Sequence, residues 1–374
     1  MGRVPGAHRL PAGSRTLRVY PPPQTRRAPR PHARRLPAAA HGAAAPAGMT
    51  LAEVLDSANA EVPSPASGGG RDGCVASLTP PLCPAPPEGR RCGGRQYSRF
   101  LWNPVMTISA FEYMLGEADE ECSRLLAQCA ALQETSIKLL DQLPIQAGWR
   151  ALDVGCGPRG ILDLLSYRVG PTGRVMGLDY QPRMIESAAH WIGERCLPNV
   201  DLICASAEAC PLPSNSFDMA HARLLLINVP RPENIVREMA RLVRPGGWIA
   251  IQERDWLSWV CIPPHPAWET LREHLAATWS GNVHIGRSLS DLLRQAGLTD
   301  IHVAAHAQVT QPGDLPHDLL LYFAQRARNQ LLNSGRLNSQ DYDRLVDELR
   351  QHLYQPHCLT LDALLVQAWG RVPV

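Results

Sequence analysis

The sequence has 374 residues, a net charge of +2 at pH 7 and 45% hydrophobic residues, so it is long enough for one large domain with appendages. It contains no apolar run long enough for a membrane span or for the core of a signal peptide. Its eleven cysteines form no Cys-x-x-Cys pair, which is typical of a reducing cytoplasm and argues against a zinc site. We therefore expect a cytoplasmic protein without a bound metal that does not enter a membrane.

The net charge is near zero, but the N-terminal segment and the rest of the chain carry charges of opposite sign. Residues 1–96 carry 13 Arg and no Lys against 5 acids, and are rich in Pro and Gly, whereas the remainder is acidic. This composition predicts a disordered tail. The tail lacks the interleaved aromatic residues that would stack on bases, so we expect no nucleic-acid partner. A transit peptide, or a translation start at Met49, are alternative interpretations of the segment.

The most informative stretch is Ala151–Gly160, where an apolar run ends in Asp153, two residues before a Gly-x-Gly turn. This order predicts a strand that leads into a cofactor-binding loop, because glycines permit the tight turn and let backbone N–H groups approach a ligand. An acid at the strand tip favours a cationic group, such as the α-ammonium of S-adenosylmethionine, over a phosphate.

The same stretch also matches the dinucleotide fingerprint Gly155-x-Gly157-x-x-Gly160, with Asp179 about 20 residues further on. The alternative is therefore an oxidoreductase that binds NAD(P) or a flavin. Against it stands Asp153, whose charge would face the pyrophosphate.

The elements that follow alternate between strands and helices, which predicts a doubly wound, mostly parallel α/β sheet. Further strands are expected over 173–179, over 200–204, in the apolar run 219–229 that follows the turn at 210–218, over 248–252 and over 300–309, and a last one over 363–371. Helices are expected from 161, over 233–243, 267–279 and 288–296, and as an insertion over about 314–353.

Several ordered motifs together resemble the class I S-adenosylmethionine-dependent methyltransferases over residues 97–372, especially the bacterial small-molecule enzymes related to the quinone-biosynthesis C-methyltransferases. The motifs are Ala-Leu-Asp-Val-Gly-Cys-Gly (151–157), Gly-Leu-Asp (177–179), Ser-Ala-Glu-Ala-Cys-Pro-Leu-Pro (206–213), Ser-Phe-Asp (216–218) and Leu-Val-Arg-Pro-Gly-Gly-Trp (242–248). Two positions depart from the family pattern: Arg159 stands where a third Gly is usual, and Ser206 where Asp is frequent.

The resemblance implies a Rossmann-like fold with seven strands, the last one antiparallel. It divides the chain into a tail (1–96), an N-terminal helical lid (97–148), the cofactor-binding core (149–310), and a helical insertion with the final strand (311–374). In such a lid Tyr113, Arg124 and Gln128 are candidates for ligand contact. For Arg124 the alternative is an ion pair with Glu120 or Glu121 on a solvated face.

The resemblance also assigns the residues of a site for S-adenosylmethionine. Asp153 would bind the methionine ammonium and Asp179 both ribose hydroxyls, since a carboxylate can accept two hydrogen bonds. The expected cofactor-binding residues are Asp153, Gly155, Gly157, Asp179, Tyr180, Met184, Ser206, Ala207 and Glu208.

Methyl transfer needs mainly in-line placement and a dry pocket, but a proton must leave an oxygen or carbon acceptor. The candidate bases are His221 after the fourth strand, and Glu253 and Asp255 after the fifth. His221 is alternatively a residue that packs under the cofactor. Two carboxylates without a third ligand make a weak metal site, so none is predicted.

These inferences predict a methyltransferase of specialised metabolism or cofactor biosynthesis that acts on a small molecule at O, N or C. Four tryptophans after the fifth strand suggest a flat or apolar acceptor, or else ordinary packing: Trp256, Trp259, Trp268 and Trp279. A non-catalytic relative that only binds the cofactor is a second hypothesis, and a homodimer is possible.

Overall fold

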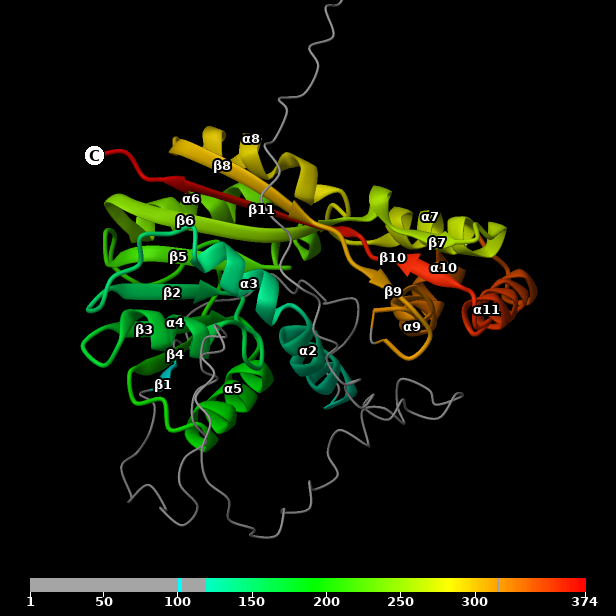
Figure 1. The fold of residues 1–374 in the computed structure, drawn as a ribbon, viewed down its shortest axis with the longest axis horizontal. Helices are drawn as coiled ribbons and strands as arrows, with labels where there is room; N and C mark the ends of the chain where they lie inside the picture. The colour runs from blue at the N-terminus through cyan, green and yellow to red at the C-terminus, as the bar shows by residue number, and fades with distance from the viewer. Residues whose placement is uncertain (1–99, 103–118, 315) are drawn as a thin grey trace, which may run out of the picture. The chain divides into compact units, whose positions relative to one another are not determined.

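The computed structural model describes residues 100–102, 119–314 and 316–374. Their main sheet has the strand order β1, β4, β3, β2, β5, β6, β11, β8 (Figure 1). The strands are β1 (Phe100–Trp102), β2 (Arg150–Val154), β3 (Arg174–Asp179), β4 (Val200–Cys204), β5 (Phe217–Arg223), β6 (Val243–Asp255), β8 (Thr299–His306) and β11 (Leu364–Arg371). β11 is antiparallel to both its neighbours, and the other pairs are parallel. The predicted fold class is confirmed, and the short edge strand β1 is an addition to the seven expected strands.

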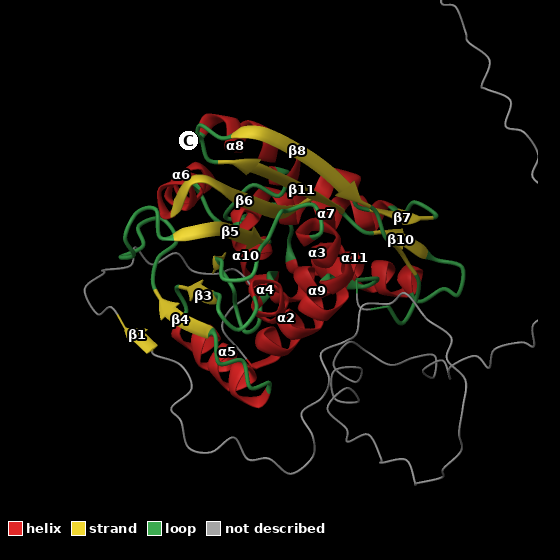
Figure 2. Ribbon diagram, turned by 60° about the vertical axis from the view of Figure 1, so that its left-hand side comes forward, coloured by secondary structure: helices red, strands yellow, loops and turns green. Residues whose placement is uncertain are grey.

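Helices cover both faces of this sheet, as Figure 2 shows. One apolar cluster joins the sheet to α4 (Leu162–Val169) and α5 (Pro182–Glu194). A second cluster joins the other face to α6 (Pro232–Leu242) and α8 (Leu289–Gln295). Because a helix buries one stripe and a central strand both of its faces, the apolar runs seen in the sequence become these two cores.

The chain order places the first predicted strand at the centre of the sheet. β2 pairs with β3 on one side and with β5 on the other, so the direction in which strands are added reverses beside it. In open α/β sheets a crevice forms outside the carboxyl ends of the strands at such a reversal. The loops after β2, β3, β4 and β5 all lie at this edge.

Two helices lie between β1 and β2 in the described chain, α2 (Asp119–Ala131) and α3 (Gln133–Leu140). Leu139 and Leu140 of α3 are fully buried in the core that contains α4 and α5. The predicted tail 1–96 and Tyr113 lie outside the described residues, so the proposed domain boundaries stay predictions.

The C-terminal insertion contains three helices, α9 (Leu319–Arg326), α10 (Arg328–Asn333) and α11 (Ser339–Leu353), which pack with α7 (Pro266–Thr278). The predicted strand 300–309 is wrong in its end: β8 stops at His306, and β9 (Val309–Thr310) joins β10 (Leu359–Leu361) and β7 (Val260–Ile262) in a second sheet. The paired strands β8 and β11 are continued beyond the main sheet by β9, which follows β8, and by β10, which precedes β11. Because β9 and β10 pair with each other, residues 309–310 belong to the second sheet. No helix within the described ranges is long and apolar enough to cross a membrane.

Candidate functional site

A cavity of about 460 Å³ lies at the carboxyl ends of β2, β3, β4 and β5. All nine predicted cofactor-binding residues line it: Asp153, Gly155, Gly157, Asp179, Tyr180, Met184, Ser206, Ala207 and Glu208. Parallel strands present their carboxyl ends at one edge, so motifs far apart in the sequence meet here.

Asp153 at the tip of β2 is 2% exposed and is held from two sides. Its Oδ2 accepts a hydrogen bond from the backbone N–H of Ile161 at 2.9 Å, and its Oδ1 lies 2.7 Å from Nδ1 of His221. Gly160 must be glycine, because a Cβ there would lie 2.0 Å from Oδ2 of Asp153 and the residue has a φ of +54°. The third glycine of the turn therefore serves the carboxylate of Asp153, one position later than the family pattern expects.

Asp179 at the tip of β3 is the second carboxylate of the cavity. Its two oxygens accept hydrogen bonds from the backbone N–H groups of Gly157 and Gln181, both at 2.9 Å. Burial raises the pKa of Asp179 from 3.8 to about 6, although these hydrogen bonds oppose the shift. The bond from Gly157 ties the glycine loop to β3, so the two motifs form one rigid unit.

The adenine-side segment follows β4. The hydroxyl of Ser206 accepts a hydrogen bond from the backbone N–H of Glu208 at 3.2 Å, and Glu208 pairs with Arg231 at 2.9 Å. Ser206 thus supports the turn of its own segment, as Ser and Asp side chains commonly do.

Two further walls of the cavity come from α2 and from the loop after β5. Gln128 lines the cavity as predicted, with Leu125 and Cys129 beside it. Arg124 does not itself line the cavity: it is 3% exposed, pairs with Glu121 at 2.7 Å and donates a hydrogen bond to Oε1 of Gln128 at 2.8 Å.

Sequence reasoning missed the end of β5, which supplies Arg223 to the cavity, and the loop that follows, which supplies Leu224, Leu225 and Asn228. Leu224 has a φ of +52°, an irregular conformation that its apolar sequence does not reveal. The available signal was length, because the apolar run 219–229 is longer than the strands expected over 173–179, 200–204 and 248–252.

The three predicted bases lie outside the cavity lining, and each is occupied elsewhere. His221 is fully buried between Asp153 and Gln252. Glu253 is fully buried and accepts a hydrogen bond from the backbone N–H of Leu226 at 2.6 Å, and burial raises its pKa to about 8. Asp255 pairs with Arg287 at 2.6 Å. This arrangement does not support a catalytic role for them, since an acid or base must reach the reacting atoms.

The four tryptophans are packing residues. Trp256, Trp259 and Trp279 surround Phe323 of α9 with ring centroids 5.5–6.2 Å from it, and Trp268 packs on Trp259. The tryptophans therefore give no support to a flat acceptor. Arg159 is also engaged away from the cavity, because its guanidinium lies 5.0 Å from the ring centre of Trp191 and pairs with Asp163.

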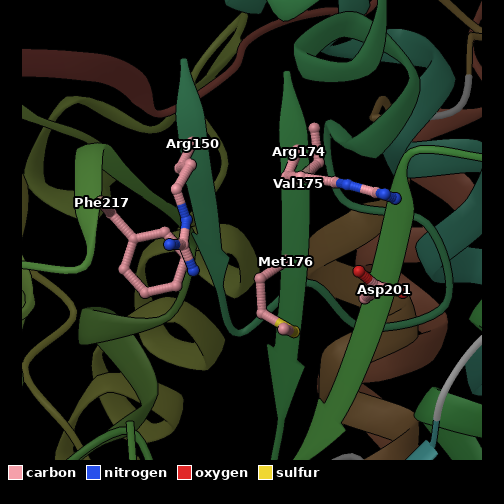
Figure 3. Close-up of a pocket in the computed structure, with 6 residues that line it drawn as sticks. All are labelled: Arg150, Arg174, Val175, Met176, Asp201 and Phe217. Atoms are coloured by element: carbon pink, nitrogen blue, oxygen red, sulfur yellow. The ribbon is translucent and has the colours of Figure 1, made fainter. Parts of the chain in front are cut away.

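A second cavity, also of about 460 Å³, lies among residues at the amino ends of the parallel strands (Figure 3). Arg150 stacks on the ring of Phe217 there, at 5.8 Å, and Arg174 and Asp201 come from β3 and β4. Phe217 of the Ser-Phe-Asp motif lies at this end of the sheet, whereas all nine expected cofactor-binding residues line the first cavity. Across the residues that the structure describes, no group of three or more His, Cys, Asp or Glu side chains is placed to hold a metal ion.

Comparison with known proteins agrees with this geometry. Residues 152–251 match a family model described as a methyltransferase domain. A demethylmenaquinone methyltransferase of Geobacillus sp. (strain WCH70) is 38% identical over 114 residues, which cover 30% of this chain and 49% of that relative. An uncharacterized 37.1 kDa protein in a transposon of Streptomyces fradiae is 30% identical over 225 residues, covering 60% of this chain and 64% of that protein. The chain thus spans about half to two thirds of the length of these relatives.

Solved structures with a similar chain course include a putative methyltransferase from Bacillus halodurans, with a TM-score of 0.43 and 14% identity over 64% of this chain and 98% of that one. From the family match and the curated relatives, residues 152–251 are a class I S-adenosylmethionine-dependent methyltransferase domain. Within that class the domain is related to the quinone methyltransferases.

Proposed function

We propose that this protein transfers a methyl group from S-adenosylmethionine to a small-molecule acceptor. The observation that carries the proposal is the pair of carboxylates Asp153 and Asp179, which stand at the tips of adjacent strands and face one cavity. A pyrophosphate would meet negative charge at this place, whereas an ammonium group and a ribose diol are well matched to it.

Different cavity residues would bind the methionine, ribose and adenine parts of the donor. Asp153 would accept hydrogen bonds from the α-ammonium group, and the backbone of Gly155 and Gly157 would line the methionine part. Asp179 would accept both ribose hydroxyls. Tyr180 and Met184 would flank the adenine, and its edge would meet Ser206, Ala207 and Glu208. S-adenosylmethionine supplies an activated methyl group on its sulfonium.

The acceptor side is formed by α2 and the loop after β5, which contribute the apolar side chains of Leu125, Leu224 and Leu225 beside the polar Gln128 and Asn228. We place the acceptor against this wall. Because His221, Glu253 and Asp255 are engaged elsewhere, catalysis would rest on placement and exclusion of water rather than on any of these three as base. The name of the Geobacillus relative refers to demethylmenaquinone, but the match covers half of that protein, so the acceptor of this chain stays open.

The donor site is tested by Asp179→Ala and isothermal titration. We expect the dissociation constant for S-adenosylmethionine to rise about tenfold or more, since two charge-assisted hydrogen bonds are lost, and we expect NADH not to bind the wild type. Asp201→Ala is the matched control, because Asp201 lies at the opposite end of the neighbouring strand β4. An unchanged dissociation constant for Asp179→Ala, or tight NADH binding, would refute the proposal.

We also propose a cytoplasmic location, a possible homodimer and no nucleic-acid partner. Cell fractionation, light scattering and a gel-shift assay are the corresponding measurements.

A further inference from the structure

A row of polar side chains crosses one face of the main sheet inside its apolar core. It contains Asp153 on β2, His221 on β5, Gln252 on β6 and Gln367 on β11, of which none is more than 2% exposed. Asp153 is the register partner of His221, and Gln252 is that of Gln367, so members of each pair lie side by side on the sheet. Buried polar groups in such a row must satisfy one another.

A backbone carbonyl at one end of the row, that of Thr135, fixes which group donates and which accepts in each hydrogen bond that follows. Nε2 of Gln367 donates to the carbonyl oxygen of Thr135 on α3 at 2.9 Å, and a carbonyl can only accept. The same amino group donates to Oε1 of Gln252 at 2.8 Å, which fixes the amide of Gln252. Nε2 of Gln252 then donates to Oγ of Ser136 at 3.1 Å and faces Nε2 of His221 at 2.9 Å.

These contacts determine which nitrogen of His221 carries the proton. Its Nε2 faces an amide donor, so it must be an acceptor without hydrogen, and the proton of the neutral ring is therefore on Nδ1. Nδ1 lies 2.7 Å from Oδ1 of Asp153 and donates to it. The charged groups near the ring are consistent with this state, because Asp153 is its only charged hydrogen-bond partner in the described chain, and Arg223 is directed to Ser136 at 2.9 Å.

We infer that His221 is a positioning residue for the donor site: locked as the neutral Nδ1–H tautomer by the row from Thr135 through Gln367 and Gln252, it orients Asp153 toward the ammonium group of the donor. The inference rests on the proposed function. In this role His221 neither abstracts a proton nor contacts a ligand. It also connects α3, which carries Thr135 and Ser136, to the carboxylate that would bind the ammonium.

The experiment compares two ligands that differ in the amino-acid part. S-adenosylhomocysteine carries the ammonium group, whereas 5′-methylthioadenosine lacks it and retains the ribose and adenine. For His221→Leu we expect the dissociation constant of S-adenosylhomocysteine to rise about tenfold or more and that of 5′-methylthioadenosine to change less than about twofold.

Two amide variants separate positioning from simple space filling. The amide nitrogen of His221→Asn can take the place of Nδ1 and restore the bond to Asp153, so we expect affinity for S-adenosylhomocysteine near that of wild type. His221→Gln places its amide toward Gln252 and should bind as poorly as the Leu variant. His306→Asn is the matched control. His306 contacts Oε1 of Gln367 at 3.0 Å, whereas the bonds from Gln367 to Thr135 and Gln252 are made by its amino group.

Nitrogen-15 NMR of the wild-type imidazole reads the tautomer directly, without any ligand. A proton on Nε2, or equal losses of both ligands in His221→Leu and His221→Asn, would overturn the inference. If the wild type binds neither ligand, the proposed function itself fails, and the NMR result still distinguishes that failure from a wrong tautomer. If His221→Leu does not fold, the Asn and Gln pair decides the matter alone.

Discussion

Asp153 and Asp179 show how much a single carboxylate depends on its surroundings. Both are almost fully buried at the tips of adjacent strands, and each accepts backbone hydrogen bonds through a turn that glycine makes possible. Asp179 nevertheless has a raised pKa of about 6, because burial outweighs the bonds it accepts. Its folded pKa exceeds the ordinary 3.8, so the stability it contributes is lost as pH rises from about 4 to 6.

This pKa predicts how donor affinity depends on pH. The ribose hydroxyls need an ionised Asp179 as acceptor, so affinity for S-adenosylmethionine should be constant above about pH 7 and fall as pH drops below about 6, approaching tenfold per pH unit. Titration calorimetry between pH 5 and 8 measures this dependence. In Asp179→Ala the step near pH 6 should be absent, and a step that persists would assign it to another group.

The glycine turn gives a second prediction at this scale. Gly157 and Gly160 share a φ of +54°, but a Cβ at Gly157 meets nothing within 4 Å, whereas one at Gly160 would lie 2.0 Å from Asp153. Gly157→Ala should cost only the backbone strain, about 1–2 kcal/mol of unfolding free energy. Gly160→Ala should cost at least about 1 kcal/mol more, since Asp153 must move. Urea denaturation of both variants measures the difference, and equal losses would contradict the role given to Gly160.

Among the elements, the loop after β5 depends most on one buried side chain. Glu253 on β6 accepts hydrogen bonds from the backbone N–H groups of Leu226 and Ile227, at 2.6 and 3.4 Å. Leu224 and Leu225 just before them line the donor cavity. Glu253, a candidate base in the sequence, is thus the anchor of the loop that we propose as the acceptor wall.

Glu253→Ala should therefore destabilise the fold by about 1–3 kcal/mol, because buried N–H groups lose their acceptor. The folded pKa of about 8 lies above the ordinary 4.5, so the stabilising contribution of Glu253 is fully present below pH 4.5 and declines as pH rises to 8. The loss on mutation should be larger at pH 5 than at pH 9 in urea denaturation.

The control for this prediction is Glu238→Ala. Burial raises the pKa of Glu238, but bonds from Arg241 and from the backbone of Cys210 outweigh it and lower the net value below 4.5. Its contribution is therefore complete at both pH 5 and pH 9, and its mutation should cost the same at both. A pH-independent loss for Glu253→Ala would contradict the assignment.

At the scale of the whole molecule, the C-terminal insertion is part of the main core. The aromatic cluster around Phe323 connects α9 to the segment after β6, and buried Arg254 on β6 pairs with Asp362 at 2.7 Å, where β10 and β11 meet. The insertion and the second sheet are thus joined to β6, the strand that carries Gln252 and Glu253. Burial of such an ion pair requires good geometry and favours one arrangement of the corner.

The sequence by itself predicted the order of the central strands and helices, and its resemblance to the methyltransferase family named nine residues for donor binding, all of which line the cavity. Eight of these residues lie at the carboxyl ends of strands or in the loops that follow them, and Met184 lies in α5 just beyond such a loop. Parallel strands bring their carboxyl ends to one edge whatever the details of packing. Only the tertiary structure decided the roles of His221, Glu253, Asp255 and the tryptophans. The partners Asp153 of His221, Ile227 of Glu253 and Arg287 of Asp255 lie 68, 26 and 32 residues away, on elements that meet only in the folded sheet. Whether a polar side chain serves a ligand or a neighbouring backbone depends on these contacts, which residue type and spacing do not specify.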